Sequence, residues 1–228
     1  MKLVLALWQP DPDALLAPSL REALASVGAT RLQVNLDDDH IPETVLRLQH
    51  FDEPLTCVVS VWTDGAAQDV LPVVRPHAER LAAWEVEERI PLRAPDSPDG
   101  QRLDGLAQVA FLRRPADLPY DDWLAHWHGP HTQIAMETQA TYGYVQNRVL
   151  SALTDDAPAV DAIVEELFPP EAMHDIHAFY GSKGSDEELG RRMTELMASV
   201  GTMGADRDLD VVATSRYVFD LDPHHTPL

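Results

Sequence analysis

The order of strand and helix signals predicts an α+β protein in which two ferredoxin-like halves form one α/β barrel within the chain. Three observations lead to this prediction. Short apolar or alternating runs typical of strands recur along the 228 residues, and amphipathic stretches typical of helices lie between them in the order β-α-β-β-α-β. A segment containing proline and glycine, 94–104, separates two such series. Each series forms a four-stranded sheet with helices on one face, so pressing the two sheets together buries both remaining apolar faces.

The first half, residues 1–93, holds the first series. Ser19 and Glu22 have the spacing of a capping box, and Gly28 stands where a helix C-terminus prefers glycine, so they bracket a short helix. Cys57 lies in the apolar run of a strand, where we expect it to pack in the core; as a single cysteine it cannot form an internal disulfide. The strands expected are 2–8, 31–36, 55–62 and 85–92, with helices at 20–27 and 71–83.

The second half, residues 105–221, repeats this order with one extra helix. Both halves end in an apolar strand that carries an arginine, Arg89 in the first and Arg216 in the second. Residues 222–228 are expected to form a tail. The strands expected are 106–113, 144–151, 160–167 and 210–220, with helices at 119–138, 171–180 and 186–199.

The charge balance excludes some classes of partner. The chain carries 38 acidic and 17 basic side chains, a formal charge of −21 with neutral histidines. Nucleic acids and polyanionic membrane surfaces are bound through Lys and Arg that neutralise phosphates, and this chain would be repelled by both. We therefore expect no nucleic acid and no membrane as partner, and an anionic substrate would need a local basic pocket. The sequence leaves open whether two copies associate into a homodimer.

The apolar run at 3–8 is too short to cross a membrane, and Pro10 and Asp11 follow it at once. It also lacks the length and the small-residue cleavage site of a secretory signal. It is therefore interpreted as a strand, and the expected location of the protein is the cytoplasm.

The most informative stretch is 111–131, FLRRPADLPYDDWLAHWHGPH, which holds two tryptophans and three histidines. On a helix with about 100° per residue, two imidazoles share an otherwise apolar face. That face comprises Tyr120, Trp123, Leu124, Trp127, His128 and His131, whereas His126 is expected to point to solvent. Metal binding is not expected, because His126 and His128 diverge by about 160° on such a helix.

Two interpretations of these histidines stay open. They could satisfy carbonyl groups that Pro130 frees where it interrupts the helix. Alternatively, they line a pocket in which an imidazole of near-neutral pKa moves a proton and the indole rings hold a flat apolar ligand. The two neighbouring tryptophans favour the pocket.

The strand expected after this helix alternates in polarity, with Val145, Asn147 and Val149 on one face. An asparagine buried among valines needs hydrogen-bond partners. Asn147 either orients a substrate carbonyl beside an imidazole or bridges backbone groups at an irregular point of the strand. Farther along the chain, Glu165 and Glu166 are expected at a strand edge with one side chain outward.

The stretch 111–131, followed by YGYVQN at 142–147, resembles the EthD domain. The matching features are a basic residue after the first strand, Trp123, Trp127, the H-x-P of His128 to Pro130, and the YVQN strand. The similarity covers about 106–221. It implies the dimeric α/β-barrel superfamily of ferredoxin-like folds and a cofactor-free small-molecule enzyme, among relatives that include polyketide cyclases, dehydratases, lactone isomerases and small monooxygenases. Family members often place a histidine where this chain has Arg148.

These observations lead to one principal hypothesis: histidine-assisted proton transfer during dehydration, cyclisation or isomerisation of an apolar carbonyl, hydroxy or polyketide-like compound. The helix at 20–27 has neither an aromatic residue nor a histidine, so the site is expected in the C-terminal half. The rival hypotheses are a non-catalytic binding protein for hydrophobic metabolites and a cofactor-free monooxygenase. The catalytic residues expected are His128, His131 and Asn147, the substrate-binding residues are Tyr120, Trp123, Trp127 and Tyr144, and neither a metal nor a cofactor is expected.

Overall fold

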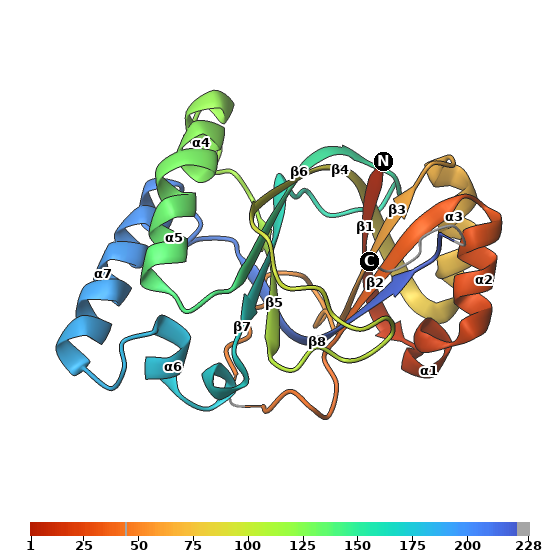
Figure 1. Ribbon diagram of the computed structural model, residues 1–228. Coiled ribbons are helices and arrows are strands. Elements are labelled where there is room, and N and C mark those ends of the chain that lie inside the picture. The colour runs from red at the N-terminus through yellow and green to blue at the C-terminus, as the bar shows by residue number, and fades with distance from the viewer. Residues whose placement is uncertain (44, 223–228) are drawn as a thin grey trace.

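The computed structural model describes residues 1–43 and 45–222. Within them, eight strands close into one barrel in the order β1-β3-β2-β8-β5-β7-β6-β4. Every neighbouring pair of strands is antiparallel. Helices α1 to α3 cover one side of the barrel and α4 to α7 cover the opposite side (Figure 1). The predicted fold class is confirmed. The predicted tail lies outside the described residues from position 223 onward.

The elements follow one another in two series of four strands. The strands are β1 (Lys2–Pro10), β2 (Ala29–Leu36), β3 (Cys57–Thr63), β4 (Ala78–Leu92), β5 (Leu106–Leu112), β6 (Gly143–Ala152), β7 (Ala162–Phe168) and β8 (Asp210–Asp220). The α-helices are α1 (Pro12–Leu16), α2 (Pro18–Ser26), α3 (Ala67–Val74), α4 (Tyr120–His126), α5 (Thr132–Thr138), α6 (Ile176–Tyr180) and α7 (Asp186–Thr202). The short helices are the 3-10 turns η1 (Arg75–His77) and η3 (Pro170–Met173) and the π-helix η2 (Trp127–His131). Among the described helices, none is long and apolar enough to cross a bilayer.

One predicted element was wrong over half its length. The helix expected at 71–83 ends at Val74, residues 75–77 form the turn η1, and 78–83 belong to the 15-residue strand β4. Leu81 and Ala83 pair with Leu7 and Leu5 of β1. Because β4 closes the barrel between β1 and β6, it is covered on both faces, and a strand buried on both faces has a continuous apolar run that also suits a helix.

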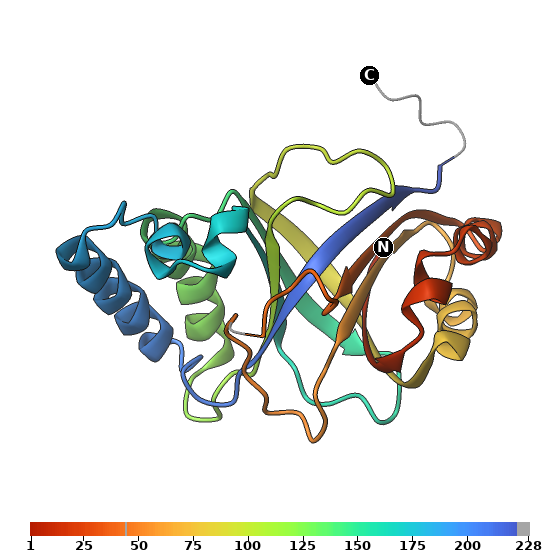
Figure 2. The same ribbon diagram turned by 90° about the horizontal axis from the view of Figure 1, so that it is seen from below.

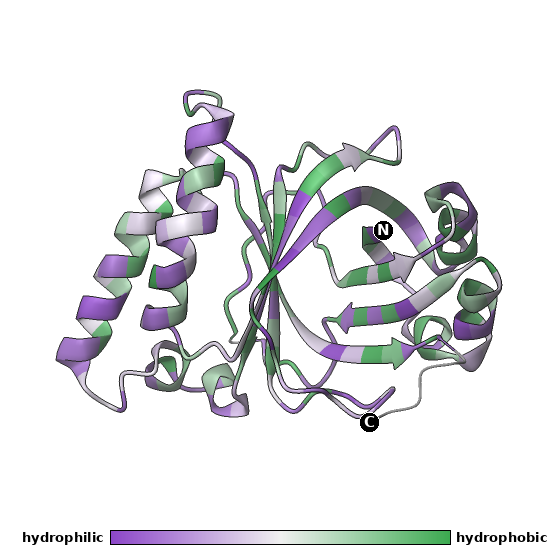
Figure 3. Ribbon diagram, turned by 45° about the horizontal axis from the view of Figure 1, so that its top comes forward, coloured by the Kyte–Doolittle hydropathy of each residue, from purple (hydrophilic) through white to green (hydrophobic). Residues whose placement is uncertain are grey.

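Hydrophobic residues recur along the strands of the barrel (Figure 3). Alternation along a strand divides its side chains between the barrel interior and the outer face. On β1, Leu3, Leu5 and Leu7 pack in the cluster under α1 to α3, while Val4 and Ala6 pack inside the barrel. Cys57 is a free thiol buried in the same cluster as the three leucines, where it fills space as expected. Burial raises the pKa of this thiol well above its usual range.

The barrel interior is apolar at one end and polar at the other. At the apolar end, Phe51 lies edge-on to both Trp8 and Phe111, with ring centroids 5.5 and 5.4 Å apart. At the polar end, the Lys2 ammonium donates to Glu88 over 2.7 Å. Burial lowers the pKa of Lys2, and the Glu88 carboxylate opposes that shift.

A second buried carboxylate, Glu165, organises the rest of the polar end. Its Oε1 accepts hydrogen bonds from Gln33 Nε2 at 2.8 Å and from Asn35 Nδ2 at 3.1 Å. The Arg216 Nε atom also lies 3.1 Å from this oxygen, within ion-pair distance. These groups come from β2, β7 and β8, so the network joins the two halves of the barrel from inside.

Residues 93–105 join β4 to β5 at the polar end of the barrel (Figure 2). The backbone N–H of Gly100 donates to Val218, and that of Leu103 donates to Arg216. This segment therefore runs beside the part of β8 that extends past its pairing with β5.

Asp210, at the start of β8, fixes the loop that closes the apolar end. Its Oδ1 accepts from the backbone N–H of His50 at 2.6 Å and of Phe51 at 2.8 Å. Its Oδ2 accepts from Arg113 Nη2 at 2.8 Å, and the Arg113 guanidinium lies 4.8 Å from the centre of the Phe51 ring. One buried carboxylate thus holds both the loop and the arginine that covers its aromatic ring.

Replacing Asp210 with Ala should lower the free energy of unfolding by about 3 kcal/mol, because the buried N–H of Phe51, the N–H of His50 and the Arg113 guanidinium all lose this carboxylate. Urea denaturation followed by circular dichroism measures this loss. Asp206→Asn, at an exposed position nearby, is the control and should change stability by less than about 0.5 kcal/mol. Equal stability of Asp210→Ala and the control would contradict the role of this carboxylate.

Candidate functional site

Helices α4 and α5 form one rod over the C-terminal sheet, joined by the π-helix η2. Pro130 lies in η2 and has no N–H to donate. Side chains bond carbonyls of the same turn: Trp127 O accepts from Thr132 Oγ1 at 2.6 Å, and His128 O accepts from Arg89 Nη1 at 2.6 Å. The π-turn is therefore tied directly to strand β4 of the sheet.

The four aromatic residues predicted to bind substrate lie together between this rod and the sheet. Trp123, Trp127 and Tyr144 are fully buried in one apolar cluster, and the Trp123 and Trp127 ring centroids are 5.4 Å apart. Tyr120 is half-buried with its ring centroid 6.2 Å from that of Trp123. Burial, followed by the charge of Glu166, raises the pKa of the Tyr144 hydroxyl. The four aromatic rings therefore provide flat apolar surfaces.

His128 lies at the rim of this aromatic cluster. It is half-buried, and its ring centroid is 4.8 Å from that of Trp127. Burial lowers the pKa of His128, and the positive charges of Arg89 and Arg148 lower it further. The imidazole is thus predominantly neutral at pH 7, as a proton acceptor must be.

His131 lies away from His128. Its Nδ1 is 3.0 Å from Ser199 Oγ on α7, and the same hydroxyl lies 3.2 Å from His126 Nε2. The expectation that His126 points to solvent was wrong, because α7 covers that side of the rod. His131, one of the expected catalytic residues, therefore has its hydrogen-bond partner on α7. Burial and then His126 lower the pKa of His131 to about 4.

Asn147 lies on the other face of the sheet, inside the barrel. Its Nδ2 donates to Ile163 O at 3.1 Å, and among the described residues its Oδ1 has no partner. It lines an internal cavity of about 10 Å³, room for one water at most. The expected placement of Asn147 beside an imidazole was wrong, because alternation along β6 gives the helix-facing side to Tyr144 and Gln146.

A row of polar residues crosses the helix-facing side of the C-terminal sheet, and we call it the polar row. Strand register places Arg89 of β4 opposite Gln146 of β6, and Arg89 Nη1 donates to Gln146 Oε1 at 3.1 Å. It also places Glu166 of β7 opposite Tyr144 of β6 and opposite Gln108 of β5. Polar groups under an apolar helix layer are costly unless they have a partner or a function.

Glu166 is the residue of this row that sequence reasoning missed. The expectation of a strand edge was wrong, because β7 lies between β5 and β6 in a closed barrel. Glu165 therefore points into the barrel and Glu166 into the helix layer. Part of the Glu166 side chain remains accessible, yet its Oε1 is enclosed, and burial raises its pKa to about 7. Strict alternation of side chains on a strand with two buried faces was the sequence signal that could have predicted the placement of Glu166 in the helix layer.

Several polar atoms of this layer lack hydrogen-bond partners among the described residues. They are Gln108 Nε2, Glu166 Oε1 and Trp123 Nε1. Buried polar atoms are nearly always hydrogen-bonded, to protein or to an occupant. Ala110, on the helix-facing side of central strand β5, also remains partly accessible. The layer therefore presents hydrogen-bonding groups beside side chains that remain partly accessible.

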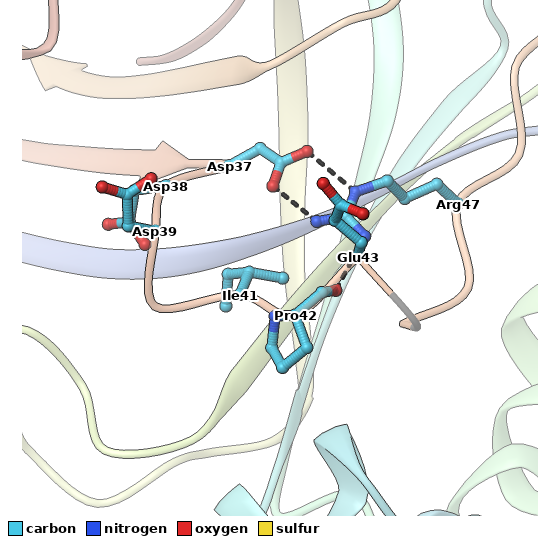
Figure 4. A pocket seen from close by; sticks show the side chains of 7 residues that line it. All are labelled: Asp37, Asp38, Asp39, Ile41, Pro42, Glu43 and Arg47. Atoms are coloured by element: carbon cyan, nitrogen blue, oxygen red, sulfur yellow. Dashed lines mark hydrogen bonds and ion pairs between the residues drawn. The ribbon is translucent and has the colours of Figure 1, made fainter.

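A larger hollow of about 550 Å³ opens on the surface beside the end of β2 (Figure 4). Two of its four acidic groups have hydrogen-bond partners within the described part of the chain: Asp37 binds Arg47 through two hydrogen bonds of 2.6 and 2.8 Å. Asp38 accepts from Ser215 Oγ and from the Tyr217 hydroxyl. These contacts anchor the loop after β2. Among the described residues, no group of three His, Cys, Asp or Glu side chains is placed to hold a metal ion.

No protein-family model and no curated protein matches the sequence. Two solved structures share its architecture over nearly the whole chain. An anthrone oxidase-like protein is 10% identical with a TM-score of 0.58, covering 100% of this chain and 95% of its own. A monooxygenase candidate from Lactobacillus acidophilus NCFM is 12% identical with a TM-score of 0.50, covering 96% and 95%. The chain has the dimeric α/β-barrel fold. At these identities the likeness concerns the fold alone.

The lowered pKa of His131 predicts that stability falls in acid. The folded state favours neutral His131, whereas the unfolded pKa is about 6.5, so stability present above pH 6.5 is lost between about pH 6.5 and 4. The loss should be about 3 kcal/mol, measured by urea unfolding across that range. His131→Gln should flatten this dependence, and His40→Gln, at an exposed site, should leave it unchanged. An equally steep dependence in His131→Gln would show that another group is responsible.

Proposed function

We propose that the C-terminal half, residues 105–221, binds a small, flat, largely apolar carbonyl or hydroxy compound between its sheet and α4–α5. There it catalyses the transfer of a proton from this compound. The first half, residues 1–93, completes the barrel, and 94–104 links the two. The observation that carries the proposal is the enclosed carboxyl of Glu166, whose Oε1 has no partner among the described residues and whose pKa is near 7. Such a group holds and releases a proton at neutral pH.

The chemistry follows from the groups around that carboxyl. Glu166 removes a proton from the carbon next to a substrate carbonyl, and the electron pair moves onto the carbonyl oxygen. The Gln108 amide supplies a hydrogen bond for that oxygen. His128, at the rim and neutral, exchanges the proton with solvent. Dehydration, cyclisation and isomerisation all begin with this step. On this proposal the EthD resemblance of 111–149 reflects the same kind of site.

Two other functions use the same site. The structural likeness to an anthrone oxidase-like protein favours a cofactor-free oxygenase as the second candidate, because a carbanion formed by proton removal is the species that reacts with molecular oxygen. A non-catalytic binding protein for hydrophobic metabolites would bind the same compound and return it unaltered. Oxygen uptake identifies the first of these, and unchanged compound identifies the second.

The exchange of α-hydrogens of 2-tetralone in D₂O tests proton transfer without knowledge of the natural substrate. The protein should accelerate the loss of the α-proton signal in ¹H NMR beyond the buffer rate. Glu166→Gln keeps the shape but cannot take a proton, and it should reduce the acceleration by about 10² to 10⁴. His128→Gln should reduce it less, since His128 acts only at the rim.

Glu171→Gln, at an exposed position of η3, is the matched control and should keep the full acceleration. Circular dichroism confirms folding of each variant. Full activity in Glu166→Gln would remove Glu166 from the mechanism. Binding of 2-tetralone with no acceleration by the native protein would favour the binding-protein alternative over catalysis.

A further inference from the structure

The rim of the proposed site carries a local excess of positive charge in a strongly acidic chain. Arg89 of β4, Arg148 of β6 and His128 of η2 meet there, and we call them the basic rim. The chain has 17 basic against 38 acidic side chains, so such a cluster departs from its overall charge. An anion repelled by most of this surface would be attracted at this point.

The contacts show how the rim is assembled. Arg89 Nη1 donates to His128 O and to Gln146 Oε1, which holds the guanidinium between η2 and strand β6. Arg148 Nε binds Glu87 Oε2 at 2.8 Å. Both guanidinium charges act on the His128 imidazole, and Glu87 is the carboxylate that opposes them there. Two cations face one anion, so the rim has one positive charge in excess.

We propose that the basic rim binds a carboxylate on the substrate, whose apolar body lies between Trp127 and the polar row. The substrate class is then an aromatic or alicyclic carboxylate rather than a wholly neutral compound. This inference rests on the proposed function, since it concerns the same proposed binding site. Guanidinium groups suit carboxylates because their N–H groups match both oxygens, and Arg89 and Arg148 are sufficiently exposed to accept a ligand. A substrate carboxylate at the basic rim keeps its negative charge away from Glu166 inside the helix layer.

Isothermal titration calorimetry with 2-naphthoate and its neutral analogue 2-naphthamide tests the inference. At low salt, 2-naphthoate should bind about three- to tenfold more tightly, as expected for a partly exposed ion pair. The preference should shrink in 0.5 M NaCl, because salt screens exposed charges. Arg148→Met should abolish the preference and Arg148→Lys should keep part of it. Arg191→Met on the outer face of α7 is the control and should retain it.

A proton NMR titration of His128 gives an independent readout. Bound 2-naphthoate should raise the pKa of His128, since an adjacent anion favours the imidazolium, whereas 2-naphthamide should not. Equal affinity for the two probes, or a preference that survives Arg148→Met, would overturn the carboxylate inference while leaving the proposed binding site and the proton-transfer proposal intact. Failure of both probes to bind would overturn the proposed binding site. Tight 2-naphthoate binding without tetralone exchange would refute only the proton transfer.

Discussion

Closure of the eight strands into one barrel is the constraint on which the rest of the structure depends. It removes every sheet edge, so each strand has one face in the interior and one under helices or solvent. A side chain on such a strand points either into the barrel or outward, and the next residue along the strand points the opposite way. Glu165 and Glu166 show the consequence, since one joins the two halves from inside and the other enters the helix layer.

The two helix layers differ in chemistry. Beneath α1 to α3 the sheet presents aliphatic side chains such as Leu3, Leu5 and Val34, which the helices cover completely. Beneath α4 and α5 the sheet presents the polar row, and the Trp123 indole N–H and Glu166 Oε1 lack partners among the described residues. The first layer stabilises the fold through apolar packing. The second layer contributes less stability, because it contains polar groups without partners that are available to a ligand. The proposed site lies in the second layer for this reason.

The helix period in the sequence sufficed to place Trp123 and Trp127 together, because both share a face of one amphipathic rod. The same period could not reveal which element covers the rod's opposite face, so the contact of His126 with α7 was missed. For Asn147, alternation separated the two faces of β6 but could not say which one the helices cover. That choice depends on how the barrel closes, through pairings between strands distant in sequence.

The ionisation of Glu166 tests the central claim, an enclosed acid–base group in the C-terminal helix layer, most directly. In protein labelled with ¹³C at the glutamate carboxyl, the Glu166 signal is identified by its loss in Glu166→Gln and followed with pH. Enclosure predicts a midpoint at about 7. A midpoint near 4.3, the value of a solvated glutamate, would mean that water reaches this carboxyl freely and would contradict the account.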